Sequence, residues 1–239
     1  IGELKPDDRY QFIFLTVREN QVEKALEDIS KNKSPNVVTM VNTIKPYGRW
    51  EKICGKGRIL PAFPGAGGCI EGGILDAQLL PRAIQPTTFG EIGGRKSSRE
   101  EALAYIFRKS HIPYQIVPEM HHWQISHLGV IIPLADAYYQ SRHPEKICAN
   151  EKLMTLTAYR MKKNLKWIAQ KGMLCPAKLY MIKDMPTGML AGVLSRVYQS
   201  EFGNRFLYRH AMHAPEEFQR LHQEFYNYMK THTKESNKA

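Results

Sequence analysis

The 239-residue sequence contains no long hydrophobic run. None of its apolar stretches approaches the ~18 residues that a membrane-spanning helix requires. The N-terminal residues also lack the basic segment and the apolar segment of a secretory signal peptide. We therefore expect a soluble, cytoplasmic protein with no membrane partner.

Cysteine is scarce, and no two cysteines form a CxxC pair. The four are Cys54, Cys69, Cys148 and Cys175. They are few for a disulfide-built fold of this size, so we expect free thiols in a reducing compartment. The neighbouring histidines are His121 with His122 and His210 with His213. We find no cysteine or carboxylate that supports either pair at ligand spacing, so the sequence predicts no metal site.

Acidic residues are outnumbered, with 34 lysines and arginines against 23 aspartates and glutamates and a net charge of +11. Such a charge is compatible with nucleic-acid binding, but the basic residues are dispersed along the chain. The densest group is Arg160, Lys162, Lys163 and Lys166. This group is more typical of a solvated helix face than of a phosphate-binding patch. We expect no nucleic-acid partner, although the charge can steer small anions towards the protein.

The first ordered pattern is a strand, a helix and a second strand. Residues 10–17 (YQFIFLTV) form an apolar run typical of a strand buried on both faces of a parallel sheet. Val22, Ala25, Leu26 and Ile29 then repeat at helical spacing. A second apolar run covers residues 37–42. This unit predicts two parallel strands joined by a right-handed crossover helix.

The unit is followed by further α/β signals up to about residue 117. The expected elements are a helix from Pro46 through Ile53 that ends near Gly55, a strand over 58–63, antiparallel edge strands within 64–92, a helix capped by Ser98 and Glu101 that runs to Arg108, and a last strand over 114–117. The sequence therefore predicts an α/β domain over residues 1–116, with a parallel sheet.

Helical periodicity replaces the strand pattern in the remainder of the chain. The expected helices cover residues 119–140, 150–171, 187–200 and 215–231, and residues 233–239 are expected to be a disordered tail. The second domain, over residues 117–239, is therefore predicted to be all-helical. The fold class is α/β followed by all-α.

Ligands of open parallel sheets bind beyond the carboxyl ends of the strands. The polar residues at these places include Arg18 and Gln21 after the first strand and Asn42 after the second. A guanidinium and side-chain amides there could contact a nucleotide phosphate, ribose or carboxamide. An equally plausible interpretation is that Asn20 and Asn42 only cap turns.

A GxGxxG dinucleotide fingerprint is missing. The glycines of PGAGG (64–68) follow a strand, but Ile70 occupies the position of the third glycine, and we interpret this segment as a structural turn. The sequence begins with Ile, within what looks like a loop entering a strand. We expect the fingerprint in an upstream segment of roughly 70 residues, and poor NADPH binding without it.

Four segments resemble the ketopantoate reductase (2-dehydropantoate 2-reductase) family from its middle onward. They are TVRENQ (16–21), MVN (40–42), PTTFGEIGGRKSSRE (86–100) and EMHHW (119–123). The resemblance covers nearly the whole chain in the same order, and PTTFGEI is its most specific part. It implies a Rossmann domain that binds NADP, a helical domain that binds substrate and could form a homodimer, and reduction of a 2-oxo acid to a 2-hydroxy acid.

The resemblance also implies roles for individual residues. Cofactor-binding positions match Thr16, Val17, Arg18, Gln21 and Asn42, and Asn42 also lies near the reacting groups. Substrate contacts fall on Trp123 and Arg209, and the position of a late acidic residue that helps to bind substrate falls on Asn204. Arg209 could anchor a carboxylate, although a surface arginine is an equal alternative.

The family's catalytic lysine and two asparagines are replaced. The matching positions hold Ile125, Gly129 and Pro133, and a shift of one residue gives Gln124, Leu128 and Ile132. His127 lies on the same expected helix and could donate a proton, although a packing histidine is the more common interpretation. We therefore expect an NADP-dependent oxidoreductase acting on a 2-oxo acid or related carbonyl, with a non-catalytic nucleotide- or metabolite-binding protein as the alternative.

Overall fold

The computed structural model describes residues 4–236 of the chain. The internal contacts divide it into two compact units. The first contains the residues up to Ala66 together with Gln78–His121, and the second contains Gly67–Ala77 together with the residues from His122 onward. Within residues 4–236, no helix combines the length and the apolar character needed to cross a membrane.

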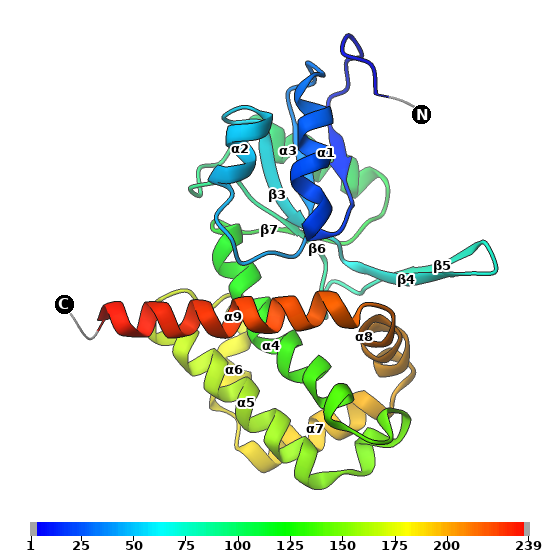
Figure 1. The fold of residues 1–239 in the computed structure, drawn as a ribbon, viewed down its shortest axis with the longest axis vertical. Coiled ribbons are helices and arrows are strands. Elements are labelled where there is room, and N and C mark those ends of the chain that lie inside the picture. The colour runs from blue at the N-terminus through cyan, green and yellow to red at the C-terminus, as the bar shows by residue number, and fades with distance from the viewer. Residues whose placement is uncertain (1–3, 237–239) are drawn as a thin grey trace. The chain divides into compact units, whose positions relative to one another are not determined.

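The first unit is built on a five-stranded mixed sheet (Figure 1). Its order is β1 (Ile13–Leu15), β2 (Val37–Met40), β3 (Ile59–Phe63), β6 (Thr87–Phe89) and β7 (Tyr114–Ile116). Within this sheet, the described pairs β1–β2, β2–β3 and β6–β7 are parallel, and β3–β6 is antiparallel. The predicted parallel relation of the first two strands is confirmed, although β1 is shorter than the apolar run 10–17.

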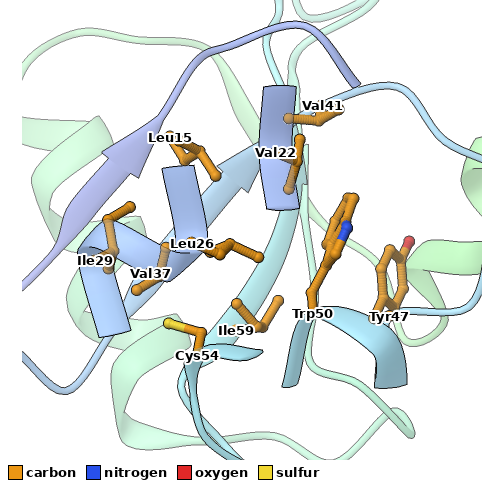
Figure 2. Packing of buried hydrophobic residues seen from close by; sticks show 10 residues of the cluster. All are labelled: Leu15, Val22, Leu26, Ile29, Val37, Val41, Tyr47, Trp50, Cys54 and Ile59. Atoms are coloured by element: carbon orange, nitrogen blue, oxygen red, sulfur yellow. The ribbon is translucent and has the colours of Figure 1, made fainter. Parts of the chain in front are cut away.

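Helix α1 (Val22–Ser30) buries the stripe that its sequence predicts. Val22 and Leu26 have no exposed surface and Ile29 has little, whereas the charged residues between them are mostly exposed. Figure 2 shows these side chains packed with Leu15, Val37 and Ile59 of the sheet. Trp50 and Cys54 of α2 (Gly48–Cys54) complete the cluster. One apolar stripe thus fixes α1 on the sheet.

The capping box of α3 (Ser98–Lys109) lies one residue earlier than predicted. Ser97 Oγ accepts from Glu100 N at 3.2 Å, and Glu100 Oε2 accepts from Ser97 N at 3.2 Å. Because two serines are followed by two glutamates, the sequence fits either register. The observed register also lets Glu100 Oε1 accept a hydrogen bond from Glu91 N at 3.0 Å, which the alternative register would not provide.

The prediction of antiparallel edge strands over 64–92 is only partly correct: β6 pairs antiparallel with β3, but it lies between β3 and β7 rather than at the edge, and the segment before it does not join this sheet. Strands β4 (Ala66–Glu71) and β5 (Ile74–Leu79) form a separate two-stranded sheet. Gly72 and Gly73 connect them at positive φ, as a tight hairpin turn requires. The PGAGG glycines therefore lead into a strand rather than a turn. A Cβ on Gly68 would lie 2.3 Å from Asp76 O, which explains why glycine occurs inside this strand.

The PTTFGEI segment is part of a buried polar network. Glu91 accepts two hydrogen bonds from Arg99, Nε at 2.6 Å and Nη2 at 2.5 Å, and one from Ser97 Oγ at 2.5 Å. Arg99 also donates to Gly57 O at 2.6 Å and to Ile59 O at 3.0 Å. The network therefore ties the segment after β6 to α3 and to the start of β3.

Glu91→Gln is expected to weaken the acid dependence of stability. Burial alone would raise the pKa of the Glu91 carboxyl, but the hydrogen bonds from Arg99 and Ser97 and the Arg99 charge bring it below its usual value. Its stabilisation is then complete above the unfolded pKa of about 4.5 and is lost as pH falls through the lower folded pKa. The variant should lose about 1–3 kcal/mol at pH 7 and show a flatter acid slope in urea titrations. Exposed Glu101→Gln is the control, and equal slopes for both variants would contradict the assignment.

The second unit consists of helices apart from the β4–β5 hairpin. They are α4 (Met120–Gln140), η2 (Pro144–Ala149), α5 (Glu151–Gln170), α6 (Lys178–Asp184), α7 (Thr187–Gln199), the π-helix η3 (Gly203–Tyr208), α8 (Arg209–His213) and α9 (Pro215–Ser236). The four predicted long helices are confirmed, whereas α6 and η3 were missed. Residues 233–236 are helical rather than a disordered tail, and residues 237–239 lie outside the described part.

Candidate functional site

The residues expected to bind a cofactor lie where β1 and β2 end. The two strands are parallel and pair Leu15 with Thr39, so the segments that follow them leave the sheet at the same edge. Thr16, Val17 and Arg18 follow β1, and Asn42 follows β2 by two residues. The first unit therefore brings both predicted segments together.

A short 3-10 turn, η1 (Glu19–Gln21), opens α1 and fixes Arg18 and Gln21. Gln21 Oε1 accepts from Arg18 N at 3.2 Å, and Gln21 N donates to Arg18 O at 2.9 Å. The side chains of Thr16, Arg18 and Gln21 are exposed, whereas Val17 is half-buried. The turn thus presents a guanidinium and a side-chain amide to solvent beside the strand end.

Asn42 has an unsatisfied acceptor. Its Oδ1 is buried and has no hydrogen-bond partner among residues 4–236. The turn after β2 is held instead by Thr43, whose Oγ1 accepts from Lys45 N at 3.1 Å. Buried polar atoms in native proteins are nearly always paired. The Asn42 carbonyl is therefore an exceptional buried acceptor without a partner in the described part of the chain.

An ion-pair cluster at the same edge was not foreseen from the sequence. Glu19 is buried and pairs with Lys45 at 3.3 Å and, at short range, with Arg49. Arg49 also pairs with Glu23 at 2.9 Å. Burial alone would raise the pKa of Glu19, but the Arg49 hydrogen bond and the charges of Lys45 and Arg49 lower it. The signal available in the sequence was an acidic residue after one strand and basic residues after the next.

His121 holds the same loop from the other side. Its Nε2 lies 2.8 Å from Ile44 O, and because a carbonyl only accepts, Nε2 carries the proton. The Tyr47 ring meets the imidazole edge-on, with centroids 5.9 Å apart. Burial raises the pKa of Tyr47 well above its usual value. The loop that carries Asn42 is therefore fixed by Glu19 on one side and His121 on the other.

In the second unit, Trp123 and His127 stack on successive turns of α4. Their centroids are 5.0 Å apart and their planes differ by 7°. Burial, with a smaller effect of the nearby His210 charge, lowers the pKa of His127 to about 3. An imidazole with this pKa is neutral at pH 7. The structure therefore disfavours His127 as a cationic proton donor, but its neutral ring can still donate one hydrogen bond.

The positions that match the family's lysine and asparagines are packing positions in α4. Ile125 has no exposed surface. A Cβ on Gly129 would lie 2.7 Å from Ile168 Cδ1, so this glycine allows α5 to approach. Pro133 lies inside the helix. The replacements therefore follow from helix packing, and none of the three residues supplies a polar side chain.

Asn204 lies in the π-helix η3, and Arg209, the first residue of α8, contacts both Asn204 and the hairpin residue Asp76. Arg209 Nε donates to Asn204 Oδ1 at 3.4 Å, and Arg209 Nη1 lies 3.7 Å from Asp76 Oδ2. Arg205, which the sequence did not suggest, donates from Nη2 to Asp76 Oδ1. π-helical turns occur often at functional sites. Two guanidinium groups thus meet one carboxylate here.

The described residues 4–236 contain no group of three or more histidine, cysteine or acidic side chains that could hold a metal ion. Among the described cysteine side chains, Cys54 and Cys148 are free thiols. The candidate residues are therefore polar or cationic side chains. Arg18, Gln21 and Asn42 belong to the first unit, and Asn204 and Arg209 belong to the second.

The sequence matches no family model and no curated protein, but the fold matches solved structures. The 2-dehydropantoate 2-reductase from Geobacter metallireducens GS-15 is 15% identical, with a TM-score of 0.57 over 91% of this chain and 77% of that chain. The ketopantoate reductase from Staphylococcus aureus, described as dimeric, is 11% identical, with a TM-score of 0.58 over 95% of this chain and 78% of that chain. D-mandelate dehydrogenase with NADH and anilino(oxo)acetate is 14% identical, with a TM-score of 0.50 over 96% and 78%. The chain therefore has the fold of the ketopantoate reductases.

Proposed function

We propose that this protein is an NADP-dependent oxidoreductase of the ketopantoate reductase family that reduces a 2-oxo acid or related carbonyl to the 2-hydroxy acid. The observation that carries the proposal is the unpaired, buried Oδ1 of Asn42 at the carboxyl edge of a parallel sheet. This edge is where open α/β folds bind their ligands. The fold is shared with a dehydrogenase whose structure contains NADH and an oxo-acid compound.

The residues of the first unit fit a nicotinamide dinucleotide. Asn42 Oδ1 would accept a hydrogen bond from the nicotinamide carboxamide. The exposed Arg18 guanidinium would pair with a phosphate, and the Gln21 amide would donate beside it. Because Glu19, Lys45 and His121 fix the loops, Asn42 would be held in place before the cofactor binds. NADP rather than NAD is proposed from the family resemblance and the net positive charge.

The residues of the second unit would bind substrate. Arg209 would anchor the substrate carboxylate, and Asn204 would orient Arg209 through its Oδ1. Trp123 would provide an apolar wall and holds His127 by stacking. The bound cofactor would supply the hydride, so negative charge grows on the carbonyl oxygen. Neutral His127 would stabilise that charge by donating a hydrogen bond, and the oxygen would take its proton from solvent water.

The proposal is tested by assaying the protein expressed from its complete open reading frame. NADPH oxidation should be measured at 340 nm with a panel of 2-oxo acids, and NADH should be compared at equal concentration. Turnover with at least one 2-oxo acid, faster with NADPH, is the expected result. Binding of neither dinucleotide would overturn the proposal.

Asn42→Ala is expected to weaken NADPH binding about tenfold. The substitution removes one hydrogen bond made by an otherwise unsatisfied buried acceptor, which is worth roughly 1–2 kcal/mol. The measurement is a fluorescence titration of NADPH. Asn227→Ala on the exposed face of α9 is the matched control and should bind NADPH as the unmodified protein does. Equal affinities for the two variants would remove Asn42 from the site.

A second candidate function is non-catalytic binding of a nucleotide or metabolite. It is favoured by buried Ile125 at the position of the family's lysine and by the low pKa of His127. NADPH binding without turnover of any 2-oxo acid would support this candidate. A homodimer is proposed for either function from the family resemblance.

A further inference from the structure

Asp76 of the β4–β5 hairpin forms ion pairs with two arginines. Arg205 of η3 and Arg209 of α8 both direct a guanidinium nitrogen at its carboxylate, at 3.7 Å for Arg209 and closer for Arg205. The three side chains remain between 26% and 46% exposed. A second arginine that converges on one carboxylate, at a π-helical turn, is the geometry of a carboxylate-binding site.

The contact leaves Arg205 incompletely paired. Its Nη2 donates to Asp76, whereas its Nε is buried and has no hydrogen-bond partner among residues 4–236. A carboxylate that approached the guanidinium side-on would pair with Nε and Nη2 together. Asp76 is tethered to a β-strand and makes only one of these two bonds. A free carboxylate could therefore bind better than Asp76 does.

The hairpin that carries Asp76 forms a two-stranded sheet separate from the main sheet. A two-stranded sheet is marginally stable by itself, and at its turn Ile74 and Leu75 are 74% and 68% exposed. Close packing is seen at Gly67, where a Cβ would lie 2.4 Å from Phe206 Cδ1. Partly exposed ion pairs add little to stability. Release of Asp76 from the arginines is therefore inexpensive.

We propose that Arg205 and Arg209 together form the site for the substrate carboxylate and that Asp76 fills this site until substrate displaces it. Arg205 would bind the carboxylate side-on, and Arg209, oriented by Asn204, would bind its second face. Asp76 then sets the affinity by competition and disfavours ligands without a carboxylate. The inference rests on the proposed function only for the identity of the ligand as a 2-oxo acid.

The test is an NMR titration of the protein with pyruvate, carried out without any dinucleotide. We expect Asp76→Asn to lower the Kd of pyruvate about fivefold, the factor by which an exposed ion pair of this kind competes. Arg205→Leu should raise the Kd at least as much. Asp184→Asn, at an exposed position of α6, changes the net charge by the same amount and should leave the Kd of pyruvate unchanged. Methyl pyruvate, which has no carboxylate, should bind equally weakly to all variants.

Each outcome decides the inference. A pyruvate Kd for Asp76→Asn that equals that of Asp184→Asn, or that is higher, would overturn it, as would absence of pyruvate binding in every variant. If Asp76→Asn does not fold, as judged by circular dichroism, Asp76→Ser takes its place. Because this titration contains no dinucleotide, its result does not depend on turnover. Tighter pyruvate binding to Asp76→Asn would support the carboxylate site even if the separate NADPH assay found no turnover, which would count against the oxidoreductase proposal alone.

Discussion

Gly203→Ala is expected to destabilise the second unit and to abolish the binding of carboxylates. A Cβ at this position would lie 2.0 Å from Val197 O and 2.9 Å from Val197 C. Both are backbone atoms, so no side-chain rotation can relieve the overlap. Overpacking of this kind costs about 1–3 kcal/mol or more. Gly203 is the first residue of η3, so its displacement would also move Asn204, Arg205 and Arg209.

The measurement is urea unfolding together with the pyruvate titration. Gly192→Ala in α7 is the matched control, because a Cβ at this position would have no neighbouring described atom within 4 Å outside its own helix backbone. In a helix interior this control should be neutral or stabilising by about 0.5–1 kcal/mol. If Gly203→Ala were as stable as Gly192→Ala and bound pyruvate normally, the π-helix would not position the arginines.

Leu26→Ala is expected to lower the free energy of unfolding of the first unit by about 2–5 kcal/mol. Leu26 has no exposed surface and lies in the cluster formed by α1, α2 and β1–β3 (Figure 2). The loss combines the hydrophobic transfer energy with the cavity that remains. Since Glu19 begins the turn that opens α1, loosening of this helix should also weaken NADPH binding.

Hydrogen exchange can assign the effect of Leu26→Ala to the first unit. Amides of β1, β2 and β3 should exchange faster, whereas those of α5 and α7 should not change. Glu27→Ala is the control, because the neighbouring Glu27 side chain is exposed on the same helix. A change of less than about 1 kcal/mol for Leu26→Ala, below the range for buried leucine, would show that α1 does not hold the sheet.

The parts of the fold that were predictable are those in which local sequence and burial agree. The stripe of α1 is set by its 3.6-residue period, and the mostly apolar, buried residues of β2 fit a strand with both faces covered. The four long helices have the same basis. In these elements, the residues whose spacing predicts a helix or strand are also the residues that become buried. The sequence alone therefore predicts them.

The parts that were missed depend on contacts distant in sequence. The β4–β5 hairpin leaves Ile74 and Leu75 exposed, so apolar residues in this segment do not mark a strand of the main sheet. The capping register of α3 is decided by Glu91, nine residues before Glu100. The π-helix follows from the fit of Gly203 beneath Val197 O, which composition does not reveal.

The candidate site was predictable in the same partial way. Asn42 was identified from its position after a strand. The structure adds that its Oδ1 is a buried acceptor without a partner in the described residues. Glu19 looked like an ordinary exposed helix residue, yet it is buried between Lys45 and Arg49. The pKa of His127 depends on burial among distant residues, which helical spacing does not describe.

The most direct test of the account follows the side-chain amide of Asn42 by NMR while NADPH is added to protein from the complete open reading frame. The signals can be assigned by their loss in Asn42→Ala. We expect them to shift and to saturate at the Kd found by fluorescence, whereas the amide of Asn227 stays unchanged. Saturating NADPH with no change at Asn42, or no binding of NADPH at all, would contradict the central claim that this strand edge is a dinucleotide site.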